Sequence, residues 1–191
     1  MPNNNIVEEL KGGRFISETI SELLKVIVIS LIIIIPVRYF LLQPFFVKGA
    51  SMEPNFYDHE YLVIDEISYR FKQPQRGEII VFRYPKDIRQ YFIKRIIGLP
   101  NDSLEIKDNA MYVNGLKLDE TGYLPKTTNT FGNAFIKLGP DEYFLMGDNR
   151  DFSLDSRSFG PVNKKYIVGR AWFRGFPFNK FKIFQAPGYK F

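Results

Sequence analysis

Several residue types that carry common protein chemistry are absent or scarce in this chain of 191 residues. Cysteine is absent, which excludes disulfides, thiolate catalysis and cysteine-based zinc sites. His59 is the one histidine, so a metal site would depend on carboxylates and a Ser/His/Asp triad has a single candidate base. The length suits one compact domain with a short appendage. Any catalytic chemistry is therefore expected from other side chains.

The net charge of +5 is spread along the chain rather than concentrated. Lysine and arginine are mixed with aspartate and glutamate, and the sequence has neither a basic block nor a groove-reading motif. This pattern disfavours nucleic acid as a partner.

An apolar stretch near the front of the chain covers residues 26–47. It has about the length that a helix needs to cross a hydrocarbon core of roughly 30 Å, and Arg38 is its one charged residue. A helix over residues 18–40 would be sufficient. The sequence therefore predicts a cytoplasmic N-terminus with a transmembrane anchor over residues 1–47, followed by a separate domain over residues 48–191.

Three alternatives to a permanent anchor fit this stretch less well. A buried helix of a soluble protein rarely carries four consecutive isoleucines, residues 32–35, with apolar residues on every face. A cleavable signal peptide needs small residues close behind its apolar core, whereas Lys48, Gly49 and Ala50 lie too far along. An interfacial helix has a strongly polar face, which is missing here. The positive charges on either side give only a weak bias in orientation.

After residue 50 the pattern changes to short apolar runs separated by glycine, proline, asparagine and aspartate. Such runs, rich in isoleucine, valine, tyrosine and phenylalanine, predict a mainly β domain of antiparallel sheets. Asn114-Gly115 predicts a type I′ hairpin, and the polar segment 119–132 predicts a surface excursion. The expected strands cover residues 61–67, 78–82, 91–97, 104–106, 111–113, 142–146 and 167–173.

The C-terminal stretch of residues 172–184 interleaves aromatic residues with Arg174, Lys180 and Lys182. Two interpretations stay open. The stretch is either a last strand with a surface turn, or a patch that lays the domain on a bilayer, where aromatic rings and cations are both favourable. The second interpretation adds membrane lipid as a contact of the domain itself.

Three motifs concentrate reactive and turn-forming residues: S-M-x-P at 51–54, K-R-I-I-G-L-P at 94–100 and G-D-N-R-D-x-S-x-D-S-R at 147–157. Taken singly they are modest signals, because such a serine is commonly a turn residue and a lysine in a strand commonly faces solvent. Together, in this order behind an apolar segment and with R-G-E-I-I-V-F at 76–82, they resemble type I signal peptidases. These are serine/lysine peptidases that remove signal peptides from exported proteins. The resemblance covers nearly the whole chain.

The resemblance implies a set of site residues and a signal-peptidase-like β domain. Ser51 matches the family's nucleophile, Lys94 its general base, and Ser153 the serine that hydrogen-bonds the lysine. Asp155 and Arg157 match positions that hold the site together as an ion pair.

The resemblance also has one departure and one consequence for selectivity. Some members have a serine two residues before the nucleophile, whose hydroxyl donates to the oxyanion hole, whereas this chain has Gly49. The second donor is then the Gly49 backbone N–H, a water molecule or nothing. Shallow apolar pockets would exclude large side chains at the cut site. Their implied walls, each of which is otherwise an ordinary core residue, are Val47, Met52, Phe56 and Ile93.

The implied chemistry depends on the charge of one amine. A lysine can take the proton of a serine only when it is neutral, and its ordinary pKa of about 10.4 must fall by roughly three units for this to happen near neutral pH. Phe92 and Ile96, on the same face of the strand as Lys94, favour that shift through burial, and a nearby cation such as Arg157 would act in the same direction. The Ser51 N–H would stabilise the oxyanion, and no metal or cofactor is needed.

Rival interpretations of the chemistry and the function stay open. His59 is a rival base, although its polar neighbours are typical of an exposed turn. A self-cleaving protein of the repressor type shares the dyad but has a soluble DNA-binding front, and a tethered β domain that binds envelope partners leaves the three motifs unexplained. The favoured interpretation is a monomeric, single-pass enzyme of the plasma membrane. Its catalytic domain lies on the extracytoplasmic side, and its partners are preprotein signal peptides and membrane lipid.

Overall fold

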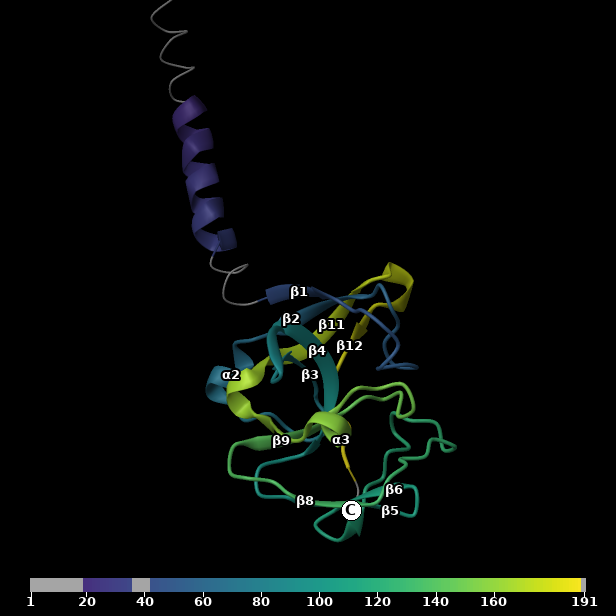
Figure 1. Ribbon diagram of the computed structural model, residues 1–191. Coiled ribbons are helices and arrows are strands. Elements are labelled where there is room, and N and C mark those ends of the chain that lie inside the picture. The colour runs from purple at the N-terminus through teal and green to yellow at the C-terminus, as the bar shows by residue number, and fades with distance from the viewer. Residues whose placement is uncertain (1–18, 36–41, 190–191) are drawn as a thin grey trace, which may run out of the picture. The chain divides into compact units, whose positions relative to one another are not determined.

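The computed structural model describes residues 19–35 and 42–189, and the chain divides into two compact units, Met1–Leu41 and Leu42–Phe191 (Figure 1). The first unit contains a helix over residues 19–35. Among the described residues, no helix combines the length and the apolar character that a membrane crossing requires. The rest of the predicted anchor before the second unit, residues 1–18 and 36–41, lies outside the described residues.

The second unit is built on an eight-stranded sheet in the order β1-β2-β11-β3-β4-β9-β10, with β12 paired to β11. Its neighbouring strands are all antiparallel, and β3 and β4 form a hairpin that is joined by a short turn. The strands are β1 (Leu42–Phe46), β2 (Tyr61–Asp65), β3 (Ile79–Tyr84), β4 (Asp87–Gly98), β9 (Glu142–Met146), β10 (Val162–Asn163), β11 (Ile167–Phe176) and β12 (Lys182–Ile183).

A smaller sheet has the order β7-β6-β5-β8. Asn114 and Gly115 have positive φ angles, 52° and 83°, which forms the predicted type I′ hairpin between β6 and β7. The segment 119–132 joins β7 to β8 without a strand or helix of its own in the described chain, as predicted. Its strands are β5 (Ser103–Lys107), β6 (Ala110–Val113), β7 (Leu116–Lys117) and β8 (Ala134–Lys137).

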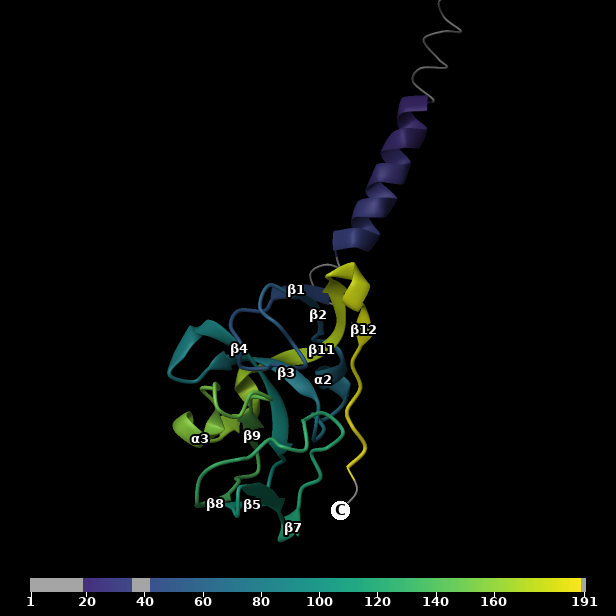
Figure 2. The same cartoon turned by 90° about the vertical axis from the view of Figure 1, so that its right-hand side faces the viewer.

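Short helical turns connect the strands of the second unit. They are α2 (Ser68–Phe71), α3 (Ser156–Phe159), η1 (Lys164–Tyr166) and η2 (Phe178–Lys180). Figures 1 and 2 place β1, β2, β11 and β12 at one end of the unit and the smaller sheet at the other, with β3, β4 and β9 between them. Strand β4 therefore runs through the middle of the unit.

Each predicted strand is present, with ends that differ by a few residues. Strand β1 was not predicted, because residues 42–46 continue the apolar stretch expected for the anchor. They pair instead with β2, from Leu42 opposite Asp65 to Phe46 opposite Tyr61. The first strand therefore begins before the expected boundary at residues 47 and 48, and the second unit begins at Leu42.

Candidate active site

Ser51 lies in a turn of the loop between β1 and β2. The N–H of His59 donates to the Val47 carbonyl at 3.1 Å and closes the base of this loop. Met52 and Phe56 are 1% and 0% exposed and anchor the turn in the apolar core that also contains β2 and β11 residues. The turn is therefore held by its buried apolar side chains while Ser51 stays partly accessible.

Strand β4 brings Lys94 to Ser51. The lysine is 4% exposed, and its Nζ donates hydrogen bonds to Ser51 Oγ at 2.8 Å and to the Ile93 carbonyl at 2.9 Å. Burial lowers the pKa of Lys94 to about 8, against the carboxylates of Asp155 and Asp148, which act in the opposite direction. A substantial fraction of this amine is therefore neutral near pH 8.

Arg157 does not act on Lys94 as expected. Its guanidinium binds Asp155 through Nε to Oδ1 and through a terminal nitrogen to Oδ2, both at 2.9 Å. The carboxylate of Asp155 is fully buried and also accepts the Gly147 N–H at 3.0 Å. Burial raises the pKa of Asp155, but its bonds with Arg157 and Gly147 outweigh burial and hold that pKa below its ordinary value. The lowering of the Lys94 pKa thus comes from burial, without help from this cation.

Gly147 lies against the backbone of Ser51. A Cβ at this position would lie 2.4 Å from the Ser51 carbonyl oxygen and 2.2 Å from Ser153 Oγ. Only glycine permits such a close approach. Ser153 is therefore at the site, but the predicted bond between its hydroxyl and Lys94 is not among the interactions found for the described residues, where the amine binds Ser51 and Ile93.

Asn149 holds the peptide groups on both sides of Ser51. Its Nδ2 donates to the Ala50 carbonyl at 3.1 Å, and its backbone N–H donates to the Ser51 carbonyl at 3.1 Å. Because a peptide group is planar, fixing the Ala50 carbonyl also fixes the direction of the Ser51 N–H. That N–H is the candidate oxyanion donor of the site.

The Gly49 N–H, one of the three possibilities left open for a second donor, is engaged elsewhere. It donates to Asp58 Oδ1 at 2.9 Å, within a loop in which Gly49 has a φ of 83°. Asp58 was not predicted as a site residue, because nothing in the local sequence indicates this contact. A second oxyanion donor must come from water or be missing in this geometry.

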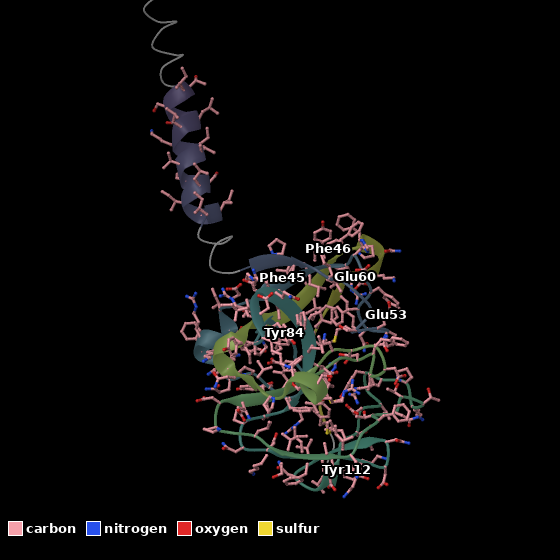
Figure 3. All side chains as sticks on the ribbon, in the orientation of Figure 1. Phe45, Phe46, Glu53, Glu60, Tyr84 and Tyr112 are labelled. Atoms are coloured by element: carbon pink, nitrogen blue, oxygen red, sulfur yellow. The ribbon has the colours of Figure 1, made fainter. Side chains whose placement is uncertain are left out.

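A cleft of about 590 Å³ opens beside Ser51 and Lys94. Val47 and Ile93 line it, as predicted, but Met52 and Phe56 do not, because both side chains are directed into the core. The rings of Phe45 on β1 and Tyr91 on β4 pack edge to face, with ring centroids 5.4 Å apart. Phe45 and its neighbour Phe46 are labelled in Figure 3. The lining residues are Phe45, Phe46, Val47, Lys48, Ser51, Leu62, Val81, Gln90, Tyr91, Phe92, Ile93, Lys94 and Leu154.

Arg95 follows Lys94 in β4 and joins a buried network. It binds Asp148 through Nε to Oδ1 at 2.8 Å and through a terminal nitrogen to Oδ2 at 2.6 Å. Asn55, four residues after Ser51, donates to Asp148 Oδ2 at 2.8 Å. Strand alternation predicts that Arg95 is directed away from Lys94. A cation in an apolar strand indicates a buried acidic partner. No sequence signal indicates Asn55.

The C-terminal stretch forms the end of β11, the η2 turn and β12. Four exposed side chains, here called the aromatic face, form a chain of ring contacts: Phe46 to Tyr61 at 4.9 Å, Tyr61 to Phe176 at 6.1 Å, and Phe176 to Phe178 at 5.6 Å. The strand and turn of the first interpretation are present. Contact with lipid stays a prediction.

A serine hydroxyl bonded to a buried amine of lowered pKa, beside an apolar cleft, is the arrangement of a serine peptidase that uses lysine as its base. Comparisons with known proteins give the same class. The family described as signal peptidase, peptidase S26, matches residues 20–176. The chain belongs to this family of signal peptidases, and it is a serine peptidase, a hydrolase.

Individual relatives carry the same description. A probable signal peptidase I-2 of Synechocystis sp. is 38% identical over 161 residues, which cover 82% of this chain and 73% of that protein. Signal peptidase I of Bacillus licheniformis is 35% identical over 173 residues, which cover 84% and 91% of the two chains. A crystal structure of a signal peptidase I from Enterococcus faecalis V583 is 33% identical, with a TM-score of 0.45, over 52% of this chain and 97% of that chain.

Proposed function

We propose that this chain removes N-terminal signal peptides from exported preproteins, with Ser51 as nucleophile and Lys94 as general base. The observation that carries the proposal is the 2.8 Å hydrogen bond between Lys94 Nζ and Ser51 Oγ, made by an amine whose pKa burial lowers to about 8. The nucleophile, the base and the cleft all come from one chain, which supports action as a monomer.

Acyl transfer follows from this geometry. Neutral Lys94 takes the proton of Ser51 as Oγ attacks the scissile carbonyl. The Ser51 N–H stabilises the resulting oxyanion, and this hydrogen bond contributes roughly 3–4 kcal/mol. The C–N bond then breaks while Lys94 protonates the leaving amine. A water molecule, deprotonated by Lys94, attacks the ester, and the proton returns to Ser51 as the acyl group leaves.

The cleft suits an extended peptide substrate. Strand β1 pairs only with β2, and Asp87 and residues 91–93 of β4 pair only with β3, within the described part of the chain. Residues of both strands line the cleft, so a substrate strand can add to their free edges through main-chain hydrogen bonds. Val47 and Ile93 then supply shallow apolar walls that favour small side chains at the cut.

His59 is a weaker candidate for the base. Its side chain is 75% exposed, and Nδ1 lies 2.9 Å from Asp58 Oδ2. The hydrogen bond to Ser51 Oγ comes from Lys94 instead. A general base has to reach the proton that it removes, which favours the lysine.

We also propose a single-pass anchor in the plasma membrane, with the catalytic domain on the extracytoplasmic side. In the helix over residues 19–35 the apolar side chains are between 48% and 64% exposed, and they cover every face of the helix. Such a surface favours lipid over water. The aromatic face of the second unit favours the bilayer interface, where aromatic side chains are enriched.

The test uses the full chain purified in detergent and a preprotein substrate. Ser51→Ala and Lys94→Ala should each abolish cleavage, while His59→Ala keeps most of it; the opposite ranking for Lys94 and His59 would reject the assignment. Cleavage of the preprotein in trans separates this function from self-cleavage. Labelling by a serine-directed acylating probe, lost in Ser51→Ala, separates it from a tethered binding domain.

A further inference from the structure

Two separate connections join the turn that carries Ser51 to the strand that carries Lys94. The first is the hydrogen bond between Ser51 and Lys94 themselves. The second begins at Asn55 in the same turn, passes through the carboxylate of Asp148, and ends at Arg95, the residue after Lys94 in β4. Any movement of the turn relative to β4 must therefore disturb both connections.

The second connection is buried at its Arg95 and Asp148 end, while Asn55 is half-buried. Arg95 and Asp148 are 3% and 2% exposed, and two parallel hydrogen bonds fix the carboxylate to the guanidinium. Asn55 Nδ2 uses its two hydrogens for Asp148 Oδ2 at 2.8 Å and for the Tyr123 carbonyl at 2.7 Å. Bonds to a charged, desolvated carboxylate are among the stronger ones in proteins, so this link resists displacement.

A further contact holds the backbone of Asn55, in addition to the contacts of its side chain. The Asn55 carbonyl accepts a hydrogen bond from Arg174, whose Nε lies 2.9 Å from Glu60 Oε2 in another buried pair. The guanidinium of Arg174 also lies 5.3 Å from the centre of the Phe56 ring. Asn55 is thus held on its backbone and on its side chain.

We propose that Asn55 is a positioning residue for the reaction. By joining the turn to Asp148 and Arg95, it keeps Ser51 Oγ within hydrogen-bonding reach of Lys94 Nζ while the substrate enters and leaves. This inference rests on the proposed roles of Ser51 and Lys94. A displacement of about 1 Å between reacting groups can lower a rate about a hundredfold, so a single lost link has a measurable effect.

The chain contains a matched control for this link. Asn114 Nδ2 donates to Asp102 Oδ1 at 2.7 Å, and Asp102 Oδ2 binds a terminal nitrogen of Arg76 at 2.9 Å. The same three residue types are therefore joined in the same order at the β6–β7 hairpin. Neither Asn114 nor Asp102 lines the cleft.

The experiment compares Asn55→Asp with Asn114→Asp in the full chain. Each substitution keeps the side-chain shape, removes a donor and places a second carboxylate against an ion-paired one. A serine-directed acylating probe counts the active sites, so that kcat is expressed per reactive Ser51 and unfolded protein does not contribute. KM for a preprotein and Tm are measured in parallel.

For Asn55→Asp we expect kcat per site to fall about tenfold to a hundredfold, with KM within about twofold of the native value. Asn114→Asp should lower Tm and leave kcat per site unchanged. Asn55→Ala, which adds no charge, should show the same fall in kcat as Asn55→Asp. Native kcat per site in both Asn55 variants, or an equal fall in Asn114→Asp, would overturn the proposal. Labelling or cleavage that survives in Ser51→Ala would instead reject the proposed dyad.

Discussion

Gly147 and Ser51 approach each other so closely that the smallest side chain would not fit between them. A Cβ on Gly147 would lie 2.4 Å from the Ser51 carbonyl oxygen and 2.2 Å from Ser153 Oγ. The backbone of the loop that follows β9 thus packs against Ser51, and the same loop supplies the Asn149 bonds to the peptide groups on both sides of Ser51. The close approach therefore requires that residue 147 has no side chain.

Gly147→Ala should therefore reduce both activity and stability. The added methyl group must displace the Ser51 backbone or Ser153, which we expect to lower kcat by about a hundredfold and stability by about 1–3 kcal/mol. Steady-state cleavage of a preprotein and thermal unfolding measure the two effects. Gly122→Ala is the control, because nothing lies within 4 Å of a Cβ there. Equal, small effects of the two substitutions would contradict this account.

The strands and the candidate pair of Ser51 and Lys94 could be proposed from the sequence, for different physical reasons. Alternating apolar runs bounded by turn residues indicate strands locally, and Asn114-Gly115 defines its hairpin without help from the rest of the fold. Strand β1 escaped prediction because a short apolar run is equally compatible with a helix and with a buried strand. The Ser51–Lys94 pair was inferred from three motifs that occur in a fixed order. Each motif alone is a modest signal, and the family resemblance assigns the roles of the two residues.

The supporting contacts could not be predicted in the same way. The bond from Gly49 to Asp58 and the bond from Asn55 to Asp148 join side chains across loops whose paths depend on the whole sheet. Local sequence carries no signal for such pairs. The family resemblance assigns Met52 to the cleft wall. Its side chain is buried instead, because the turn after Ser51 directs it into the core.

The pH dependence of activity should report the titration of Lys94. Its pKa of about 8 means that the amine is protonated and inactive as a base well below that pH. We expect kcat/KM to rise tenfold per pH unit below about pH 7 and to level off above pH 8 to 9. A rate of preprotein cleavage that is constant from pH 5 to 9 would refute the assignment.

Stability should depend on the same titration. Because folding lowers the pKa of Lys94 from 10.5 to about 8, the unfolded chain binds more protons between these values, and stability rises with pH across that window. Below pH 8 the burial of charged Lys94 lowers the free energy of unfolding by its full amount, roughly 3 kcal/mol at about 1.4 kcal/mol per pKa unit. Lys94→Met should therefore be more stable than the native chain at pH 7. Denaturant unfolding should show this advantage shrinking between pH 8 and 10.5, and a constant difference would contradict it.

Asp58 should influence catalysis through Gly49. Its carboxylate accepts the Gly49 N–H at 2.9 Å and so fixes the backbone two residues before Ser51. Asp58→Ala removes this acceptor and should lower kcat by up to about tenfold, whereas Asp58→Asn keeps an acceptor oxygen and should retain most activity. Preprotein cleavage by the two variants tests this difference. His59→Ala controls for the contact of Asp58 with His59, and a loss equal to that of Asp58→Ala would assign the effect to the histidine instead.

Selectivity at the cut site should respond to the walls of the cleft and not to the core beneath it. Ile93 lines the cleft, so Ile93→Ala enlarges the pocket and should raise relative kcat/KM for a larger side chain next to the cut by about tenfold or more. Phe56 is fully buried, and Phe56→Ala should cost about 3–5 kcal/mol of stability without changing this preference. Cleavage of a peptide panel that varies the residues one and three positions before the cut, with unfolding measured alongside, distinguishes the two. A changed preference in Phe56→Ala, with Ile93→Ala unchanged, would mean that the buried turn rather than the cleft wall determines selectivity.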